Sequence, residues 1–215
     1  MPTSHSIQNH TTQKPAVTSY PLHSLIEARW SPRAFTDAPM PVEHIGSLLE
    51  AARWSSSCFN DQPWRFFVGH KTESPETYNA LFSSLVEFNQ QWAKPCPLLV
   101  LGVANLHFSH NGKPNAHAEY DLGQATTSMI LQAQSLGYHA HSMAGFNMDA
   151  TYDAFDIPRG LAKPMAITAF GVAGEANLLS DQGMQESETA PRQRHAIQAM
   201  AFEKHWGQPF TACFN

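Results

Sequence analysis

The chain has 215 residues, of which 42% are hydrophobic and 14% are charged, so it is long enough to bury a substantial core as one globular domain. Its formal net charge of −5 argues against a nucleic-acid or anionic-membrane surface, because those partners require clustered positive charge. Three widely spaced cysteines, a polar start and no run of 18 apolar residues favour a cytoplasmic protein without an export signal or membrane span.

Apolar periodicity and turn residues predict alternating helices and strands. Residues 1–20 lack periodicity and are expected to form a flexible N-terminal tail before a single domain over 21–215. In chain order, the patterns predict a helix over 21–28, a helix over 41–54, a strand over 64–69, helical structure over 75–93, a strand over 96–104, a long helix over 117–137, a strand around His139 and His141, a short helix over 149–156, a strand over 163–173 and a helix over 195–205. This alternation predicts an α/β (α+β) fold.

The helix over 117–137 is expected to be the longest and most buried. Its apolar residues form one wide stripe, made of Leu122, Ala125, Met129, Ala133 and Leu136 and widened by Ile130 and Leu131. A stripe wider than one small sheet needs is consistent with a second subunit.

Two arginines and a hydroxyl group lie within five positions near the start of the predicted domain. Arg29, Ser31 and Arg33 share one side of an extended segment, and in a helix the two arginines would still be neighbours. Such a group suits a phosphate monoester, because arginine offers a planar fork of donors and serine adds one more. The alternative is a solvated turn whose arginines pair with Glu27 or Asp37.

The stretch SSSCFNDQPWRFFVG, residues 55–69, places two amides just before a strand. Asn60 and Gln62 alternate, so both can present a donor and an acceptor to the edge of a heterocycle. The alternative is an ordinary helix-to-strand loop followed by a core aromatic residue, Trp64.

Together, ARWSPRAF and SSSCFNDQPWRFF resemble the FMN-dependent nitroreductase family, whose members carry an Arg-x-Ser-x-Arg/Lys-x-Phe motif and a Ser-x-x-Asn-x-Gln-Pro-Trp loop. The resemblance continues through FNQQWAKPCPLLVLG, YDLGQATTSMILQAQSLGYHAHSMAGFN and PRQRHAIQAM, and spans about residues 21–207. It implies a three-layer fold with a central mixed, mostly antiparallel sheet flanked by helices. It also implies an intertwined homodimer with two FMN sites at the interface.

The resemblance assigns the basic residues to the flavin. It implies that Arg29 and Ser31 hold the FMN phosphate region and that Arg33 lies near the N1/O2 edge, where a cation stabilises negative charge on the ring. Arg192 and Arg194 match a late basic pair that returns to the phosphate. The alternative for this pair is a charged helix start beside Glu186 and Glu188.

The resemblance also assigns residues around the ring. The loop with Ser56 is expected to cross to the other subunit's flavin, Asn89 to face the pyrimidine edge, and the backbone of Ala144 and Gly145 to approach flavin N5. Two positions depart from the pattern: the loop usually has proline at Ser56, and one branch has glutamate at Ala144. The implied cofactor-binding set is Arg29, Trp30, Ser31, Arg33, Ser56, Ser57, Cys58, Asn60, Gln62, Asn89, Met143, Ala144, Gly145, Arg192 and Arg194.

The implied reaction is a ping-pong transfer in which NAD(P)H reduces FMN and an electron-poor acceptor, a nitroaromatic or a quinone, is then reduced. No catalytic side chain is expected, because the cofactor carries the electrons. Two alternatives stay open: a flavin-dependent dehydrogenase or dehalogenase of the same fold, and a non-catalytic flavin-binding redox sensor. Specificity is expected to reside in Phe59 and the loop over 106–118.

Other chemistry finds little support in the sequence. The twelve histidines include no pair joined by a convincing carboxylate or thiolate, so no metal site is predicted. Cys58 has no histidine or acid placed to activate it, and it is expected to be a small packing residue. The chain contains neither a GxGxxG turn nor a P-loop, which argues against a Rossmann NAD fold and a nucleotide triphosphatase.

Overall fold

A four-stranded sheet forms the centre of the computed structural model, which describes residues 13–213. The strands are β1 (Trp64–His70), β2 (Leu98–Asn105), β3 (His139–Met143) and β4 (Ala162–Gly171), in the order β1-β2-β4-β3. The α+β prediction is confirmed, and all three pairings among the described strands are antiparallel. Most of the predicted N-terminal tail, residues 1–12, lies outside the described residues.

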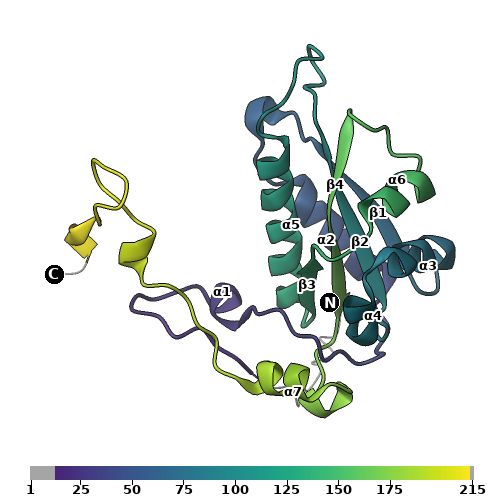
Figure 1. Cartoon of the computed structure of the whole chain (residues 1–215), viewed down its shortest axis with the longest axis horizontal. Coiled ribbons are helices and arrows are strands. Elements are labelled where there is room, and N and C mark those ends of the chain that lie inside the picture. The colour runs from purple at the N-terminus through teal and green to yellow at the C-terminus, as the bar shows by residue number, and fades with distance from the viewer. Residues whose placement is uncertain (1–12, 214–215) are drawn as a thin grey trace, which may run out of the picture.

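Helices cover both faces of the sheet and give three layers (Figure 1). On one face lie α2 (Val42–Arg53) and α5 (Ala118–Ser135), and on the other lie α3 (Pro75–Ser84), α4 (Glu87–Ala93) and α6 (Met148–Ala154). Strand β2 is buried on both faces, so its side chains alternate between two apolar clusters: Leu99 packs in the cluster of Trp92, and Leu98 packs in that of Met129.

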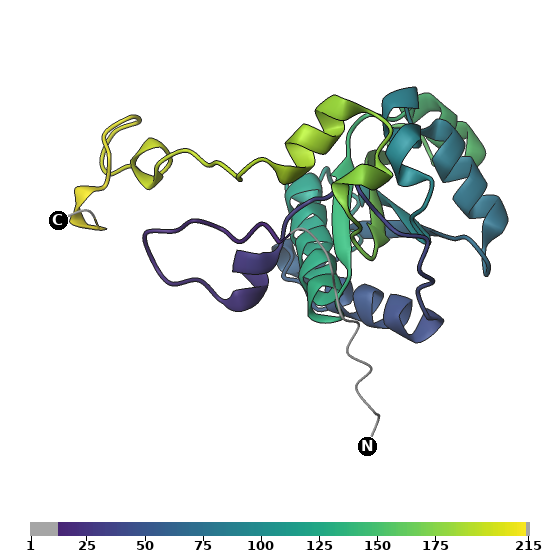
Figure 2. The same ribbon diagram turned by 90° about the horizontal axis from the view of Figure 1, so that it is seen from below.

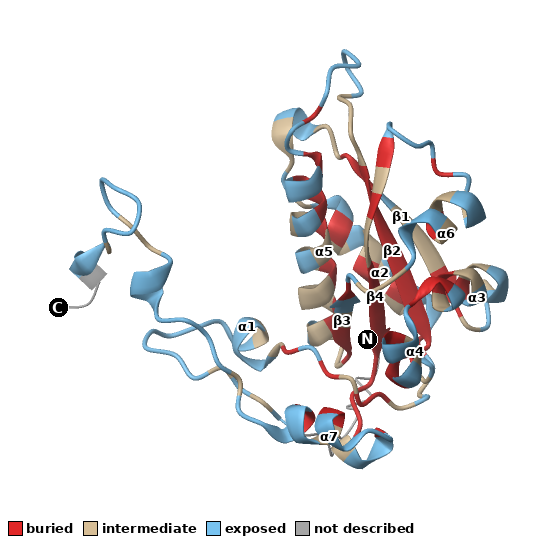
Figure 3. Cartoon of the chain, viewed as in Figure 1, coloured by how far each residue is buried: buried red, intermediate tan, exposed pale blue. Residues whose placement is uncertain are grey.

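The centre of the predicted apolar stripe of α5 is covered by its own chain, while Ile130, Leu131 and Leu136 are half-buried. Leu122, Ala125, Met129 and Ala133 are buried against the sheet and α2, and Figure 3 shows this side of the helix in red. The outer side, with Tyr120, is exposed. The buried centre of the stripe therefore gives no separate support for a second subunit.

The helical structure predicted over 75–93 is two helices with a break between them. Leu85 and Val86 are extended, with φ near −64° and −63° and ψ of 145° and 150°. Val86 N donates to the carbonyl of Gly145 over 3.1 Å, and Leu85 forms a bridge with Phe146. This pairing with the segment after β3 overrides local helix propensity and places the start of α4 beside that segment.

The C-terminal region differs from the prediction. The prediction of a helix over 195–205 is wrong, because the only helical structure there is the 3₁₀ turn Ile197–Ala199. None of the residues of this turn is buried. A helix that was not predicted, α7 (Gln182–Thr189), precedes it, and the side chain of Asp181 caps it by accepting from Met184 N over 2.7 Å.

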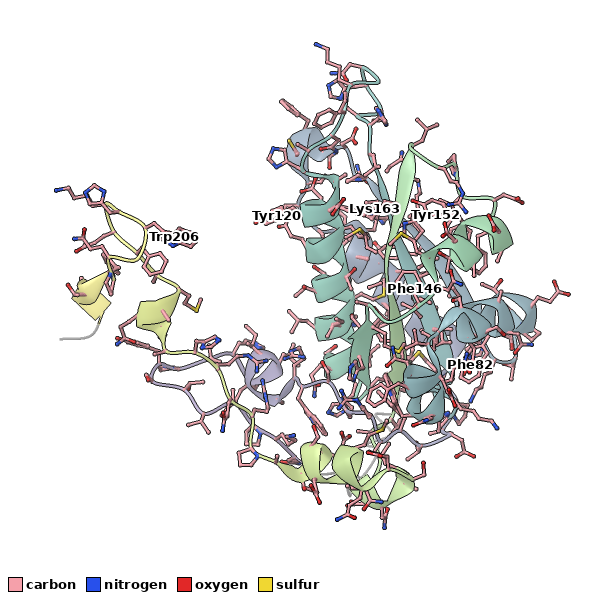
Figure 4. All side chains as sticks on the ribbon, in the orientation of Figure 1. Phe82, Tyr120, Phe146, Tyr152, Lys163 and Trp206 are labelled. Carbon is pink, nitrogen blue, oxygen red and sulfur yellow. The ribbon has the colours of Figure 1, made fainter. Side chains whose placement is uncertain are left out.

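Two segments extend away from the body. Figures 1 and 2 show the N-terminal segment through α1 (Ser24–Ala28) and the chain after α7 projecting on the same side of the molecule. Short 3₁₀ turns at Cys58–Asn60, Ala176–Leu178 and Thr211–Cys213 complete the fold. Trp206 is 95% exposed on the outer segment, and Figure 4 shows it far from the sheet.

Candidate functional site

A small cavity of about 180 Å³ collects basic side chains from three distant parts of the chain. Five of its lining residues are basic and one is acidic. They come from the N-terminal segment, the segment after α1, and the end of α7 with the chain beyond it. The lining residues are Lys14, Arg29, Trp30, Ser31, Arg33, Ser187, Glu188, Arg192 and Arg194, and we call this set the cationic pocket.

Positive charges in the cationic pocket repel one another. Burial lowers the pKa of Arg29 from its ordinary value, and the charge of Arg194 lowers it further. The pKa of Arg192 is lowered by burial, then by Arg29 and Arg194. The four ion pairs among residues 13–213 all lie elsewhere, so the predicted alternative, in which Glu27 or Asp37 pairs with these arginines, is not observed. Such a pocket favours an anion.

The segment carrying Arg29, Ser31 and Arg33 is not helical, and backbone contacts hold it against the chain that follows β4. Thr36 N donates to the carbonyl of Val172 over 2.9 Å, and Gly174 N donates to the carbonyl of Ala34 over 2.8 Å. The ring of His141 on β3 lies 2.8 Å from the carbonyl oxygen of Pro32. These bonds hold the backbone, and Arg29 donates to Ser31 Oγ over 3.4 Å at the wall of the pocket.

Two histidines on β3, His139 buried and His141 half-buried, contact the segment that carries the pocket. Trp30 meets His139 edge to face with 6.0 Å between ring centroids, and His141 packs on Trp92 at 4.6 Å. Burial, with a smaller contribution from Arg29, lowers the pKa of His139 to about 4, and burial also lowers the pKa of His141. The ring of His139 is therefore neutral at pH 7 and adds no charge to the pocket.

Arg33 joins the cationic pocket to a second group of predicted residues. Its guanidinium lies 5.7 Å from the ring centroid of Phe88 on α4, next to Asn89. Its Nε is buried without a hydrogen-bond partner, so this N–H can donate a hydrogen bond to a ligand. The fold thus places the cationic pocket and Asn89 in one region of a single chain.

The contacts of Asn89 and Gly145 refine their predicted roles. Asn89 Nδ2 donates to the carbonyl of Gly145 over 2.9 Å. A Cβ at Gly145 would lie 2.8 Å from Asn89 Nδ2 and 3.0 Å from Val86 Cγ2, so α4 itself requires glycine here. Met143 is buried and Ala144 is exposed, so the backbone of this segment is open to a ligand on one side.

The loop with Ser56, Ser57, Cys58, Asn60 and Gln62 lies at the other end of α5. Cys58 N donates to Asp121 Oδ2 over 3.0 Å, and Ser56 Oγ donates to Gln124 Oε1 over 2.9 Å, near the start of that helix.

The same loop is conformationally unusual. Phe59, Asn60 and Gln62 have φ of 53°, 54° and 51°, which is uncommon for residues other than glycine.

The motif with Trp30 lies at the opposite end of α5 from this loop, because Trp30 contacts His139, which follows the C-terminal end of that helix. One chain therefore does not bring the two motifs together.

Sequence reasoning missed three pocket residues, Lys14, Ser187 and Glu188. Lys14 lies in the segment expected to be flexible, where no periodicity or motif singles it out. Glu188 is 2% exposed, although the sequence suggested only a solvent-facing charge beside Arg192. The one available signal was the spacing of Met184 and Glu188, which are four residues apart and both buried on α7.

Other features of the described chain do not suit an anion. A wider hollow of about 570 Å³ on α2 contains Glu43 and Glu50 and no lysine or arginine. Within residues 13–213, no group of three or more His, Cys, Asp or Glu side chains is arranged to hold a metal ion. No helix in that range is long and apolar enough to cross a membrane.

The chain is similar to known flavin proteins. A family model described as the nitroreductase family matches residues 26–172. A solved structure described as an oxidoreductase containing FMN is 38% identical, with a TM-score of 0.82 over 88% of this chain and 95% of its own. An uncharacterized 15.4 kDa protein of Mycolicibacterium smegmatis is 30% identical over 67% of this chain and 99% of its own length. The major NAD(P)H-flavin oxidoreductase of Aliivibrio fischeri is 27% identical over 43% of each chain.

Proposed function

Because this chain belongs to the nitroreductase family, we propose that it is an FMN-dependent oxidoreductase that uses NAD(P)H to reduce an electron-poor acceptor such as a nitroaromatic or a quinone. The observation that carries the proposal is the cationic pocket, where five basic side chains converge without an ion pair among them. A dianionic phosphate would relieve their repulsion.

The residues present fit FMN. Arg29, Ser31, Arg192 and Arg194 would hold the phosphate, and the unpartnered Nε of Arg33 would face the ring edge near Asn89. Bound FMN would supply the two-electron chemistry. The protein would orient the ring, exclude water and balance charge, which requires no dedicated acid–base pair.

We also propose that the active form is a homodimer. The N-terminal and C-terminal segments project from the body (Figure 2). On them Val17, Met200 and Trp206 are 94%, 73% and 95% exposed, and a second copy of the chain would cover such side chains. The loop over 56–62, remote from its own chain's pocket, would then reach the partner's flavin. Each site would draw residues from both subunits.

A visible spectrum and steady-state kinetics test the function. Protein purified with its cofactor should be yellow and should release FMN on denaturation. NADH or NADPH oxidation that depends on an added nitroaromatic or quinone supports the reductase. Reduction of bound FMN without turnover of any acceptor would favour a redox sensor, and turnover only of other substrates would favour a dehydrogenase or dehalogenase. Failure of both nicotinamides to reduce bound FMN would rule out the proposed reaction.

A further inference from the structure

The cationic pocket contains a buried carboxylate whose partners are backbone groups. Glu188 on α7 is 2% exposed. Its Oε1 accepts from the N–H of Arg33 and of Ala34, each over 2.9 Å, and its Oε2 accepts from Arg33 N over 3.2 Å. These bonds hold the segment that carries Arg33 against α7.

Glu188 brings a negative charge to the pocket without forming an ion pair with a basic side chain among the described residues. None of the ion pairs found within residues 13–213 includes it, so the amides of Arg33 and Ala34 satisfy its oxygens. A carboxylate paired directly with Arg29 or Arg194 would compete with a ligand phosphate for the same donors. In the observed arrangement neither guanidinium group has a carboxylate partner among residues 13–213: Arg29 donates to Ser31 Oγ, and Arg194 Nη1 donates to the carbonyl of Gln193.

The charge of Glu188 nevertheless acts on the pocket. Burial lowers the pKa of Lys14, the charge of Glu188 raises it, and Arg192 and Arg33 lower it again. Lys14 Nζ donates to the carbonyl of Ser187, the residue before Glu188, over 2.9 Å. Glu188 is the one acidic residue among those that line the pocket. It therefore offsets part of the repulsion that the basic residues exert on one another.

We propose that Glu188 is a built-in counter-anion and positioning residue of the cationic pocket, which fixes the Arg33 backbone and stabilises the pocket before a phosphate-bearing ligand binds. The inference rests on the proposed function in one respect, the phosphate of the ligand. The negative charge of Glu188 also repels the phosphate of the ligand. It therefore stabilises the flavin-free protein and lowers the affinity for the ligand.

Two substitutions separate the backbone contact from the charge. Glu188→Gln keeps an oxygen that can accept from both amides and removes the charge. Glu188→Ala removes both. Glu186→Gln is the matched control, because Glu186 lies on the same helix, loses the same charge and is exposed, with Gln182 as its hydrogen-bond partner.

The first experiment needs no flavin. Thermal unfolding of the flavin-free protein should give a midpoint about 2–4 °C lower for Glu188→Gln than for wild type, with Glu186→Gln unchanged. Added inorganic phosphate should raise the midpoint of Glu188→Gln more than that of wild type, because it replaces the missing charge. Equal midpoints for Glu188→Gln and wild type, or equal responses to phosphate, would overturn the proposal.

The second experiment compares FMN with riboflavin, which lacks the phosphate. Glu188→Gln should bind FMN about fivefold more tightly than wild type and riboflavin equally well, because only the phosphate is repelled by the carboxylate. Glu188→Ala should bind FMN about tenfold more weakly, because the Arg33 segment loses its anchor. If Glu188→Gln binds FMN no more tightly than wild type, the counter-anion role is wrong.

The outcomes distinguish this inference from the proposed function. If wild-type protein does not bind FMN, the proposed function fails, while the melting comparison with inorganic phosphate still decides the role of Glu188. If wild type binds FMN and Glu188→Gln changes neither the melting midpoint nor the preference for FMN over riboflavin, this inference fails and the proposed function stands.

Discussion

The side-chain amide of Asn89 donates to the carbonyl of Gly145 over 2.9 Å and so joins the first turn of α4 to the segment that follows β3. Val86 N donates to the same carbonyl over 3.1 Å. Two donors at the start of α4 thus share one acceptor, which lies 56 positions from Asn89 in the sequence, at the place where a flavin ring is proposed to lie.

Gly145→Ala should disturb this junction. The added Cβ would lie 2.8 Å from Asn89 Nδ2, so α4 or the 143–145 segment must shift. We expect a loss of about 1–3 kcal/mol in the free energy of unfolding, measured with urea, together with weaker FMN binding. Gly46→Ala in α2 is the control, because its Cβ meets no atom within 4 Å, and it should be neutral or stabilising. A Gly145→Ala protein as stable as wild type would show that the junction is loose.

Arg29→Ala should weaken FMN binding selectively. The phosphate would lose a charge-assisted contact worth about 1.5–3 kcal/mol, which lowers affinity by roughly ten- to 150-fold. Riboflavin affinity should change little. Arg159→Ala removes an exposed arginine that pairs with Asp149 and Asp153, and it should leave both affinities unchanged. Unchanged FMN affinity in Arg29→Ala would place the phosphate elsewhere.

The protein should lose stability as the pH falls from about 6.5 to about 4. Burial lowers the pKa of His139 in the folded state to about 4, below its ordinary value of 6.5. Between these values the unfolded chain binds a proton that the folded chain does not, so folding stability rises with pH across this window and is lost as the pH falls. The pKa shift of His139 contributes up to about 3 kcal/mol to the free energy of unfolding above this window.

His139→Phe tests the assignment, since it keeps a ring against Trp30 and removes the titrating group. Its unfolding free energy should vary less between pH 4 and pH 6.5 than that of wild type. His195→Gln, at an exposed position on the outer segment, is the control and should retain the wild-type profile. Parallel profiles for wild type and His139→Phe would assign the pH dependence to other groups.

The C-terminal segment should determine the oligomeric state. Light scattering of the full chain should give twice the 23.8 kDa mass of one chain. A chain ending after Ala196 keeps Arg192 and Arg194 but lacks the exposed Met200 and Trp206, so it should dissociate to a monomer at micromolar concentration. Lys204→Ala, an exposed change on the same segment, should remain dimeric. A monomeric full-length protein would contradict the proposed assembly.

The sequence by itself determined the elements that depend on local pattern. The strands β1, β2 and β4 follow short apolar runs bounded by glycine and proline, and α5 follows a long stripe with a helical period. Such signals come from residues within one or two turns of each other, so they do not require knowledge of the fold. The Arg29–Arg33 motif is equally local. Its residues line the cationic pocket, and their role in binding a phosphate stays a prediction.

Only the tertiary structure decided the rest of the site. The break at Leu85 and Val86 follows from pairing with a segment about 60 positions away, which no local propensity encodes. Arg33 and Glu188 are 155 positions apart, and their contact arises because α7 returns to the segment after α1. From the sequence alone, Glu188 is expected to be a solvent-exposed charge. Its burial, with backbone amides in place of water as hydrogen-bond donors, depends on contacts between parts of the chain that are remote in sequence.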